Sequence, residues 1–277
     1  MKKKTIIRLA FIFAVSVSVN SNAQRYVENN RIIDTLEILK SKKLLNDLNT
    51  DNFKRKVHTG IKSAIPYRLL SPKEVIPGKK YPLVITFHNS SRIGNDNQNQ
   101  LKPLARIWIR DEIYRNFNCF VIAPQFNKRS SDYVKGDDDI LKSLPSNDVH
   151  EILKLIDETE KNYPVDRRRI FLIGYSMGAS TAQNLFSLRP EKFAALISIA
   201  GVADFSNIEK LKRKKIWLIH GKQDIDNPYM VSEELYRKLA GNKKLIFSSY
   251  KNLDHNNIMV PFLLTEDIPK WLFEADK

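Results

Sequence analysis

Short apolar runs alternate with longer mixed stretches along most of the chain, from about residue 53 onward. The short runs are rich in Val, Ile and Phe, as is typical of strands that are buried on both faces. They predict strands over 65–70, 82–87, 118–123, 169–173, 194–199, 215–220 and 244–250. The mixed stretches carry apolar residues at helical spacing and predict helices over 99–117, 147–162, 177–189, 230–240 and 261–274.

This alternation predicts an α/β fold with a mainly parallel central sheet and helices on both of its faces. The runs that precede the first long helix are expected to pair antiparallel at one edge. No internal repeat, low-complexity tract or Gly/Ser-rich linker divides the chain after residue 53. One domain over 53–277 is therefore the simplest interpretation.

A polar segment over 24–52 precedes this domain. Its apolar residues recur at mixed spacings of three and four, at Ile32, Leu36, Leu39, Leu44, Leu45 and Leu48. This spacing predicts one helix. We expect it to pack on the outside of the domain or to form a semi-independent lead-in.

The first 23 residues have the pattern of an export signal. Four basic residues are followed by an apolar stretch over 9–19, and Ser-Asn-Ala at 21–23 offers the small residues that signal peptidase recognises. The apolar stretch is shorter than the ~20 residues that span a bilayer, which argues against an anchor. We expect cleavage after Ala23 and a periplasmic or secreted mature protein.

The formal net charge is +15, and it falls to +11 without the four basic side chains of residues 1–23. Such a surplus can indicate nucleic-acid binding. Here, however, Lys and Arg are spread along the chain, and the densest group, over 210–215, leads directly into a predicted strand. We therefore expect no nucleic-acid partner. Cys119 is the only cysteine, which excludes an intramolecular disulfide, and its apolar neighbours predict a buried thiol.

The sequence Gly-Tyr-Ser-Met-Gly at 174–178 matches Gly-x-Ser-x-Gly, in which the serine stands on a sharp turn between a strand and a helix. The predicted strand 169–173 and helix 177–189 supply that context. The turn would hold the serine Oγ above the sheet, and the helix N-terminus would favour developing negative charge. Ser176 is thus the candidate nucleophile of an α/β-hydrolase fold.

A serine nucleophile needs a general base that an acid orients, and in this fold the acid and then the base follow the serine along the chain. Of five histidines, only His220 and His255 follow Ser176. His220 ends a predicted strand, where a histidine is expected to brace the following loop. His255 lies in a polar loop after the strand 244–250, from which it can reach the serine. His255 is therefore the favoured base.

The loop after the strand 215–220 offers Asp224 and Asp226 as the acid. Asp224 lies closer to the end of the strand and is favoured, whereas Asp226 precedes Asn-Pro and could cap the next helix. Asp254 adjoins His255 in sequence, but neighbours in an extended loop usually point apart. It is the weaker candidate.

The tetrahedral intermediate needs two backbone N–H donors. One is expected from Met177, directly after the nucleophile, and the other from the loop after the strand 82–87, where we choose Ser90. His88 begins that loop, but no second His, Asp or Glu follows at metal-ligand spacing. We expect no metal site and no cofactor.

Further short segments stand out beside the serine motif: IPYRLL at 65–70, GKKYPLVI at 78–85, GNDN at 94–97, IAPQ at 122–125, VDRRRI at 165–170, RPEKFAA at 189–195 and HGKQD at 220–224. Together they resemble a group of secreted bacterial α/β-hydrolase esterases, related to feruloyl and acetylxylan esterases, polyhydroxybutyrate depolymerases and prolyl-oligopeptidase-like peptidases. By the family pattern Ser176, Asp224 and His255 match the triad. Two positions depart from it: Asn89 and Asp254 each stand where the family has glycine.

The resemblance implies an exported enzyme that cleaves carboxylic esters, with acyl groups on carbohydrates or similar small molecules as substrates. Trp108, Tyr133 and Tyr229 are candidate residues for stacking against a sugar ring. Two alternatives remain. A serine peptidase would use the same triad on amides, and a catalytically silent binding protein would keep only the fold.

Overall fold

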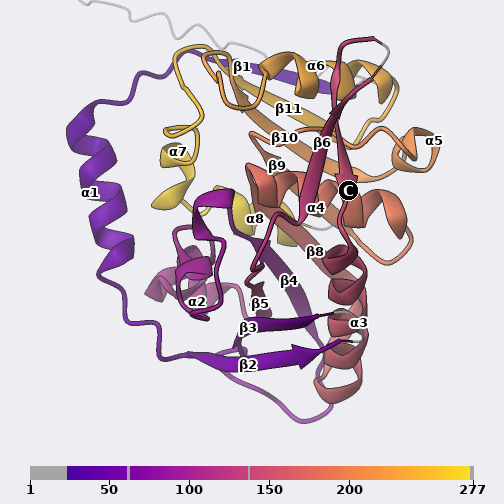
Figure 1. Cartoon of the computed structure of the whole chain (residues 1–277). Coiled ribbons are helices and arrows are strands. Elements are labelled where there is room, and N and C mark those ends of the chain that lie inside the picture. The colour runs from indigo at the N-terminus through magenta and orange to yellow at the C-terminus, as the bar shows by residue number, and fades with distance from the viewer. Residues whose placement is uncertain (1–23, 61–62, 137, 275–277) are drawn as a thin grey trace, which may run out of the picture.

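The computed structural model describes residues 24–60, 63–136 and 138–274, so the predicted signal segment 1–23 lies outside the described part of the chain. In this part a nine-stranded sheet has the order β1-β11-β10-β9-β8-β4-β5-β3-β2 (Figure 1). Its strands are β1 (Arg25–Asn29), β2 (Phe53–Thr59), β3 (Ala64–Leu70), β4 (Tyr81–Phe87), β5 (Phe120–Pro124), β8 (Val165–Tyr175), β9 (Ala195–Ile199), β10 (Lys215–Gly221) and β11 (Leu245–Tyr250). A separate antiparallel hairpin joins β6 (Ser131–Lys135) to β7 (Leu141–Pro145).

Helices flank this sheet. The α-helices are α1 (Thr35–Asn46), α2 (Asp111–Asn116), α3 (Asn147–Asn162), α4 (Met177–Leu188), α5 (Ile208–Leu211), α6 (Tyr229–Lys238), α7 (Val260–Leu263) and α8 (Asp267–Phe273). Three short 3-10 helices are η1 (Ser90–Arg92), η2 (Asn99–Leu101) and η3 (Ala105–Ile109). Within the described ranges, no helix is long and apolar enough to cross a membrane.

The predicted α/β class is confirmed, and so is the antiparallel edge. The strands from β1 to β5 in the spatial order all pair parallel, from β1 on β11 through to β4 on β5. Within the central sheet of the described residues, β3 on β5 and β2 on β3 are the antiparallel pairs. Because the parallel strands end at one edge, the loops that follow β4, β8, β10 and β11 meet there.

Two hydrophobic cores lie on the two faces of the sheet. Along β4, Leu83 and Ile85 point into the core under α3, α4 and α6, whereas Val84 points into the core under α2, α7 and α8. The same alternation places Leu172 of β8 on the first side and Phe171 on the second. With both faces buried, the central strands are mostly apolar over their buried length. This is why the sequence predicted all of them.

Two of the predicted helices were wrong in extent. The single helix over 99–117 is instead η2, η3 and α2 in succession, because Pro103 has no N–H to donate and its ring clashes with a preceding helical turn. The helix over 261–274 is divided into α7 and α8. Pro269 lies in the first turn of α8, where a proline is tolerated, whereas it would interrupt a helix running on from 261.

The segment 24–52 contains the predicted helix, and it also contains an unpredicted strand. Helix α1 stands at the outside of the molecule beside α7, held there by the buried side chain of Leu45 (Figure 1). Its Leu36 and Leu39 are largely exposed. Strand β1 adds to the edge of the central sheet by pairing with β11. Its residues are mostly exposed, so no apolar alternation marked it in the sequence.

Candidate active site

Ser176 stands at the turn between β8 and α4, in a backbone conformation that few residues adopt. Its φ is 58° and its ψ is −125°, outside the regions favoured by L-residues. Such a conformation costs about 1–3 kcal/mol and persists only where the surroundings enforce it. Here the N–H of Ser176 donates to the carbonyl of Ile199 on the neighbouring strand β9, at 2.9 Å. The strained turn therefore directs the serine side chain away from the edge of the sheet.

The two glycines of the motif are required by close backbone approach. A Cβ on Gly174 would lie 2.1 Å from the carbonyl oxygen of Gly178. A Cβ on Gly178 would lie 2.3 Å from the carbonyl oxygen of Phe87, the last residue of β4. Both distances are far below van der Waals contact. Gly178 thus brings the start of α4 against the loop that begins at His88.

The structure brings the three residues of the predicted triad together. His255 Nε2 lies 2.8 Å from Ser176 Oγ, and His255 Nδ1 lies 2.7 Å from Asp224 Oδ2. Both distances are those of hydrogen bonds. Because Asp224 accepts the Nδ1 proton, Nε2 keeps a free lone pair directed at the serine hydroxyl. All three side chains are largely buried, and they come from the loops after β8, β10 and β11.

His220 braces the acid, as expected from its position at the end of β10. It is fully buried, its Nε2 lies 3.1 Å from Asp224 Oδ2, and its Nδ1 lies 2.7 Å from Ser232 Oγ. Nε2 also lies 3.0 Å from the carbonyl oxygen of Asn227. Two acceptors at Nε2 fix the proton there, so Ser232 donates to Nδ1. His220 therefore supports Asp224 without reaching Ser176.

Asp224 also closes the turn that follows it. Its Oδ1 accepts from the N–H of Asp226 at 3.0 Å and from the N–H of Asn227 at 2.8 Å. Burial alone would raise the pKa of Asp224, but the hydrogen bonds from His220, His255 and the Asn227 N–H outweigh it. They hold the pKa of this carboxyl well below its usual range. Asp224 is therefore ionised at neutral pH.

The other two aspartates near the site occupy different places. Asp226 is exposed and lines the cavity over Ser176, whereas Asp254 Oδ1 accepts from the N–H of Asn257 at 3.0 Å. Asp224, Asp226 and His255 each place one potential ligand atom within 4.8 Å of the others. His255 Nδ1, however, donates its proton to Asp224 and has no lone pair for a metal ion. The hydrogen-bonded arrangement is the one that serine chemistry needs.

The predicted oxyanion donors lie on the two segments that the close approach at Gly178 brings together. Ser90 and Met177 are the first residues of η1 and α4, so neither N–H has an acceptor inside its own helix. His88 orients the first of them. Its Nδ1 donates to the carbonyl of Asn89 at 2.8 Å while its Nε2 accepts from the N–H of Phe126 at 3.1 Å. In a trans peptide this carbonyl and the Ser90 N–H point in opposite directions, which turns the N–H away from His88.

The two departures from the family pattern cost no backbone strain. Asn89 has φ −78° and ψ 171°, an extended conformation open to any residue. Asp254 is not among the described residues with positive φ. Glycine is therefore not required at either position by the backbone.

Because His88 is buried, we predict that the free energy of unfolding depends on pH. Burial lowers the pKa of His88 to about 4 from the ordinary value of about 6.5, because the charged ring would lose its hydration. The unfolded chain binds a proton at this site below pH 6.5 while the folded chain does not. Stability from this group is therefore complete above pH 6.5 and is lost as the pH falls toward 4, by about 2–4 kcal/mol.

We expect His88→Gln to remove this dependence of the free energy of unfolding on pH. Urea unfolding of both proteins between pH 4.5 and 7.5 would measure it, and the stability advantage of the unsubstituted protein should shrink as the pH falls. An advantage that stays constant with pH would show that His88 does not titrate in this way.

A cavity of about 720 Å³ opens over Ser176 and His255. Its wall includes Arg129 and Tyr133, and Arg129 lies 4.7 Å from the centre of the Tyr133 ring. Of the three aromatic residues suggested for sugar stacking, only Tyr133 is placed here. Trp108 is 1% exposed and belongs to the core, so that suggestion was wrong. Tyr229 stacks on Phe247 and does not line the cavity.

Two residues that support the site were missed in the sequence. Tyr175 donates its hydroxyl proton to the carbonyl of His255 at 2.6 Å and lies with its ring against the imidazole. Asn227 donates its side-chain N–H to the carbonyl of Ala200 at 2.7 Å, tying the acid loop to the end of β9. Tyr175 stands inside the Gly-x-Ser-x-Gly motif. Its place beside the nucleophile was the available signal.

Comparison with known proteins agrees with the fold. The phospholipase/carboxylesterase family model matches residues 133–262, which include all three members of the triad. No curated protein sequence matches the chain significantly. Among solved structures, a thermostable esterase is 29% identical with a TM-score of 0.73, covering 82% of this chain and 64% of its own. The chain therefore spans slightly less than two thirds of that esterase.

More distant structures share the fold. A ferulic acid esterase from Anaeromyces mucronatus in complex with ferulic acid is 14% identical, with a TM-score of 0.59 and coverage of 88% of this chain and 94% of that chain. An acylaminoacyl peptidase from Pyrococcus horikoshii is 15% identical, with a TM-score of 0.59 and coverage of 85% and 44%. The chain thus has the α/β-hydrolase fold. It is similar to phospholipases/carboxylesterases and other esterases, the group indicated by its motifs.

Proposed function

We propose that the protein is a serine hydrolase that cleaves carboxylic esters through an acyl-enzyme. The observation that carries the proposal is the continuous hydrogen-bonded chain from Ser176 through His255 to Asp224. The family match and the esterase at 29% identity support ester chemistry in particular. A scaffold that had lost catalysis would have no need for the strained backbone at Ser176.

In the first step His255 Nε2 takes the proton of the Ser176 hydroxyl as Oγ attacks the ester carbonyl. The negative charge that develops on the carbonyl oxygen is held by the N–H groups of Ser90 and Met177. When the tetrahedral intermediate collapses, the carbon–oxygen bond to the alcohol breaks. His255 gives its proton to the leaving alcohol, and the acyl group stays on Ser176.

In the second step water replaces the alcohol. His255 removes a proton from the water, whose oxygen attacks the acyl carbon, and Ser176 leaves with the proton from His255. Asp224 remains ionised throughout and stabilises the imidazolium form of His255. Each turnover therefore consumes one ester and one water and releases one acid and one alcohol.

We propose acyl esters of carbohydrates or similar small polar molecules as the substrate class. The cavity over Ser176 is lined by polar side chains such as Ser90, Asn227 and Asn256, which can hydrogen-bond to hydroxyl groups. Tyr133 offers an aromatic surface in the same wall. The complex of a distant structural relative with ferulic acid is in keeping with this choice. We also propose that the protein is exported, on the strength of the signal pattern in residues 1–23.

A panel of 4-nitrophenyl acyl esters, aryl esters of carbohydrates and peptide 4-nitroanilides tests the proposal. Without a separate device for amide leaving groups, we expect kcat/KM for the best ester to exceed that for any amide by at least about 100-fold. Turnover of amides alone would favour the peptidase alternative. No turnover of any member would favour a silent binding protein.

A further inference from the structure

A second cavity of about 200 Å³ lies next to the one over Ser176. Asn89, Ser91 and Asn256 line both cavities, so the loop that carries the oxyanion donor separates them. The far wall of the second cavity comes from α1, through Lys42 and Asn46. The second cavity therefore lies between this loop and α1, directly beside the cavity over Ser176.

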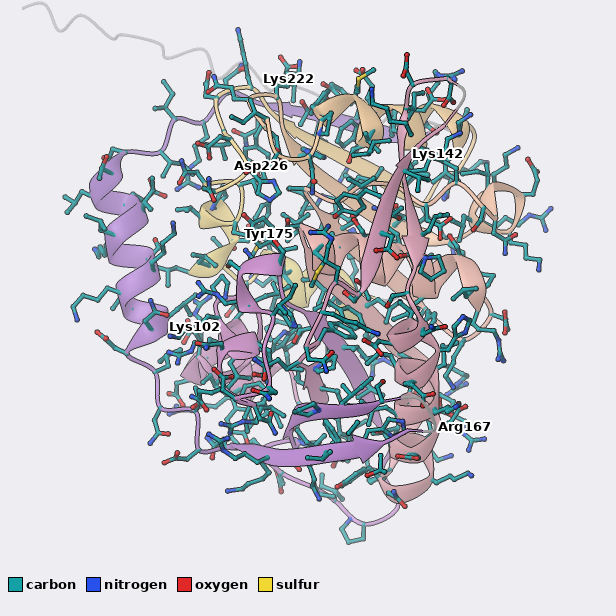
Figure 2. All side chains as sticks on the ribbon, viewed as in Figure 1. Lys102, Lys142, Arg167, Tyr175, Lys222 and Asp226 are labelled. Carbon is teal, nitrogen blue, oxygen red and sulfur yellow. The ribbon has the colours of Figure 1, made fainter. Side chains whose placement is uncertain are left out.

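The floor of this second cavity is apolar. Tyr175, Met259 and Leu263 line it, together with the ring of Pro103. Tyr175 is the residue whose hydroxyl holds the backbone of His255, so the floor begins directly beside the catalytic base. Figure 2 labels Tyr175 near the middle of the molecule and Lys102 next to the lower end of α1.

The rim of the cavity is cationic. Lys42, Arg92 and Lys102 line it, and no acidic residue appears among the described residues around it. In the described part of the chain, none of the three makes an ion pair with a carboxylate, unlike Lys192, which pairs with Asp157. Arg92 also has its Nε buried without a hydrogen-bond partner. Three cations held together without a counter-charge favour an anionic ligand.

The catalytic cavity has a different balance of charge. Its wall carries one cation, Arg129, and two carboxylates, Asp132 and Asp226, among the described residues. It therefore suits a neutral, hydroxyl-rich group. Together, the two cavities suit a substrate that has a neutral polar group at one end and an apolar stem with an anionic group at the other.

We propose that the second cavity is a substrate subsite for an amphipathic anion, a short apolar stem that ends in a carboxylate or a similar negative group. The preferred substrates are then esters in which one end carries such a group and the other end is neutral and polar. This inference rests on the proposed ester hydrolysis. Lys42, Arg92 and Lys102 bind the negative end, and the apolar floor beside Tyr175 accepts the stem.

Two pairs of matched esters test the preference and show which end of the ester enters the subsite. The 4-nitrophenyl monoester of adipic acid against 4-nitrophenyl hexanoate places the charge on the acyl end. An acetyl ester of 3-hydroxybenzoate against that of 3-hydroxybenzamide places it on the alcohol end. We expect the anionic member of one pair to have a kcat/KM about 10-fold or more above its neutral partner, mainly through a lower KM.

Lys102→Gln and Lys42→Gln should each lower that preference, the ratio of kcat/KM for the anionic ester to that for its neutral partner, by about 5-fold. Lys40→Gln is the matched control, because Lys40 lies on the same helix, changes the net charge equally and does not line the cavity. It should keep the preference. Raised salt should reduce the preference of the unsubstituted protein, as expected for charges at a partly open site.

Hydrolysis of neutral esters without any preference for the anionic ones would overturn the subsite and leave the proposed function standing. A preference that Lys102→Gln and Lys40→Gln reduce equally would also overturn it, since only long-range charge would then be acting. If no ester is hydrolysed, the proposed function fails, and the subsite is decided by binding. Calorimetry with monomethyl adipate and Ser176→Ala should then show binding that Lys102→Gln weakens, and its absence would overturn the subsite too.

Discussion

Replacing Ser176 by alanine is expected to lower kcat for ester hydrolysis by about 10⁵-fold, leaving only the slow reaction that the oxyanion donors support. The reason is that Ser176 Oγ is the atom within 2.8 Å of His255 Nε2, and alanine removes it without filling or emptying much space. Initial rates with a 4-nitrophenyl ester at saturating concentration would measure the change. Thermal unfolding should show that the variant is folded.

The control is Ser71→Ala. Ser71 follows β3, whose last residue pairs with the N-terminal half of β5, so it lies at the opposite edge of the sheet from the catalytic loops. It should keep full activity. If Ser176→Ala retained more than about a tenth of the rate, the hydrolysis would have to come from another group.

Replacing Asp224 by asparagine is expected to lower kcat by about 10³- to 10⁴-fold. An asparagine amide can donate to His255 Nδ1, which drives the proton to Nε2 and leaves no lone pair for the serine hydroxyl. The substitution also removes the negative charge that stabilises the imidazolium. Because the carboxyl accepts from His220 as well, the variant should lose stability, so rates are measured where unfolding curves show it folded.

Asp226→Asn is the comparison that separates the two aspartates of this loop. Asp226 is exposed and lines the cavity. Of the two aspartates, Asp224 is the one whose carboxylate accepts a hydrogen bond from His255. We expect its kcat to stay within about fivefold of the unsubstituted protein. Equal losses in the two variants would contradict the assignment of Asp224 as the acid.

The central sheet could be predicted from the sequence because both of its faces are buried. Strand β4 and residues 170–175 of β8 are buried at every position and mostly apolar, and such runs are hard to mistake. The edge strands β1 and β2 have mostly exposed residues, so their pairing depends on neighbours that are distant in the chain. The hairpin of β6 and β7 has the same character.

The triad could be predicted because chain order and a short list of histidines left few choices, and Ser176, Asp224 and His255 lie together as expected. The contacts that support the triad could not be predicted in this way. The hydrogen bond from Tyr175 to the carbonyl of His255 joins residues 80 positions apart. The cationic rim joins Lys42 on α1 to Lys102 in a different segment, and no local pattern records that meeting.

Labelling of Ser176 by a fluorophosphonate probe tests the central claim most directly. The probe phosphonylates a serine only when a neighbouring base and oxyanion donors activate it. Peptide mass spectrometry of the folded protein should find one adduct, on Ser176, formed at a rate that falls sharply in Asp224→Asn and is absent from Ser176→Ala. A folded protein that gains no adduct at Ser176, or gains it at the same rate in Asp224→Asn, would contradict the account.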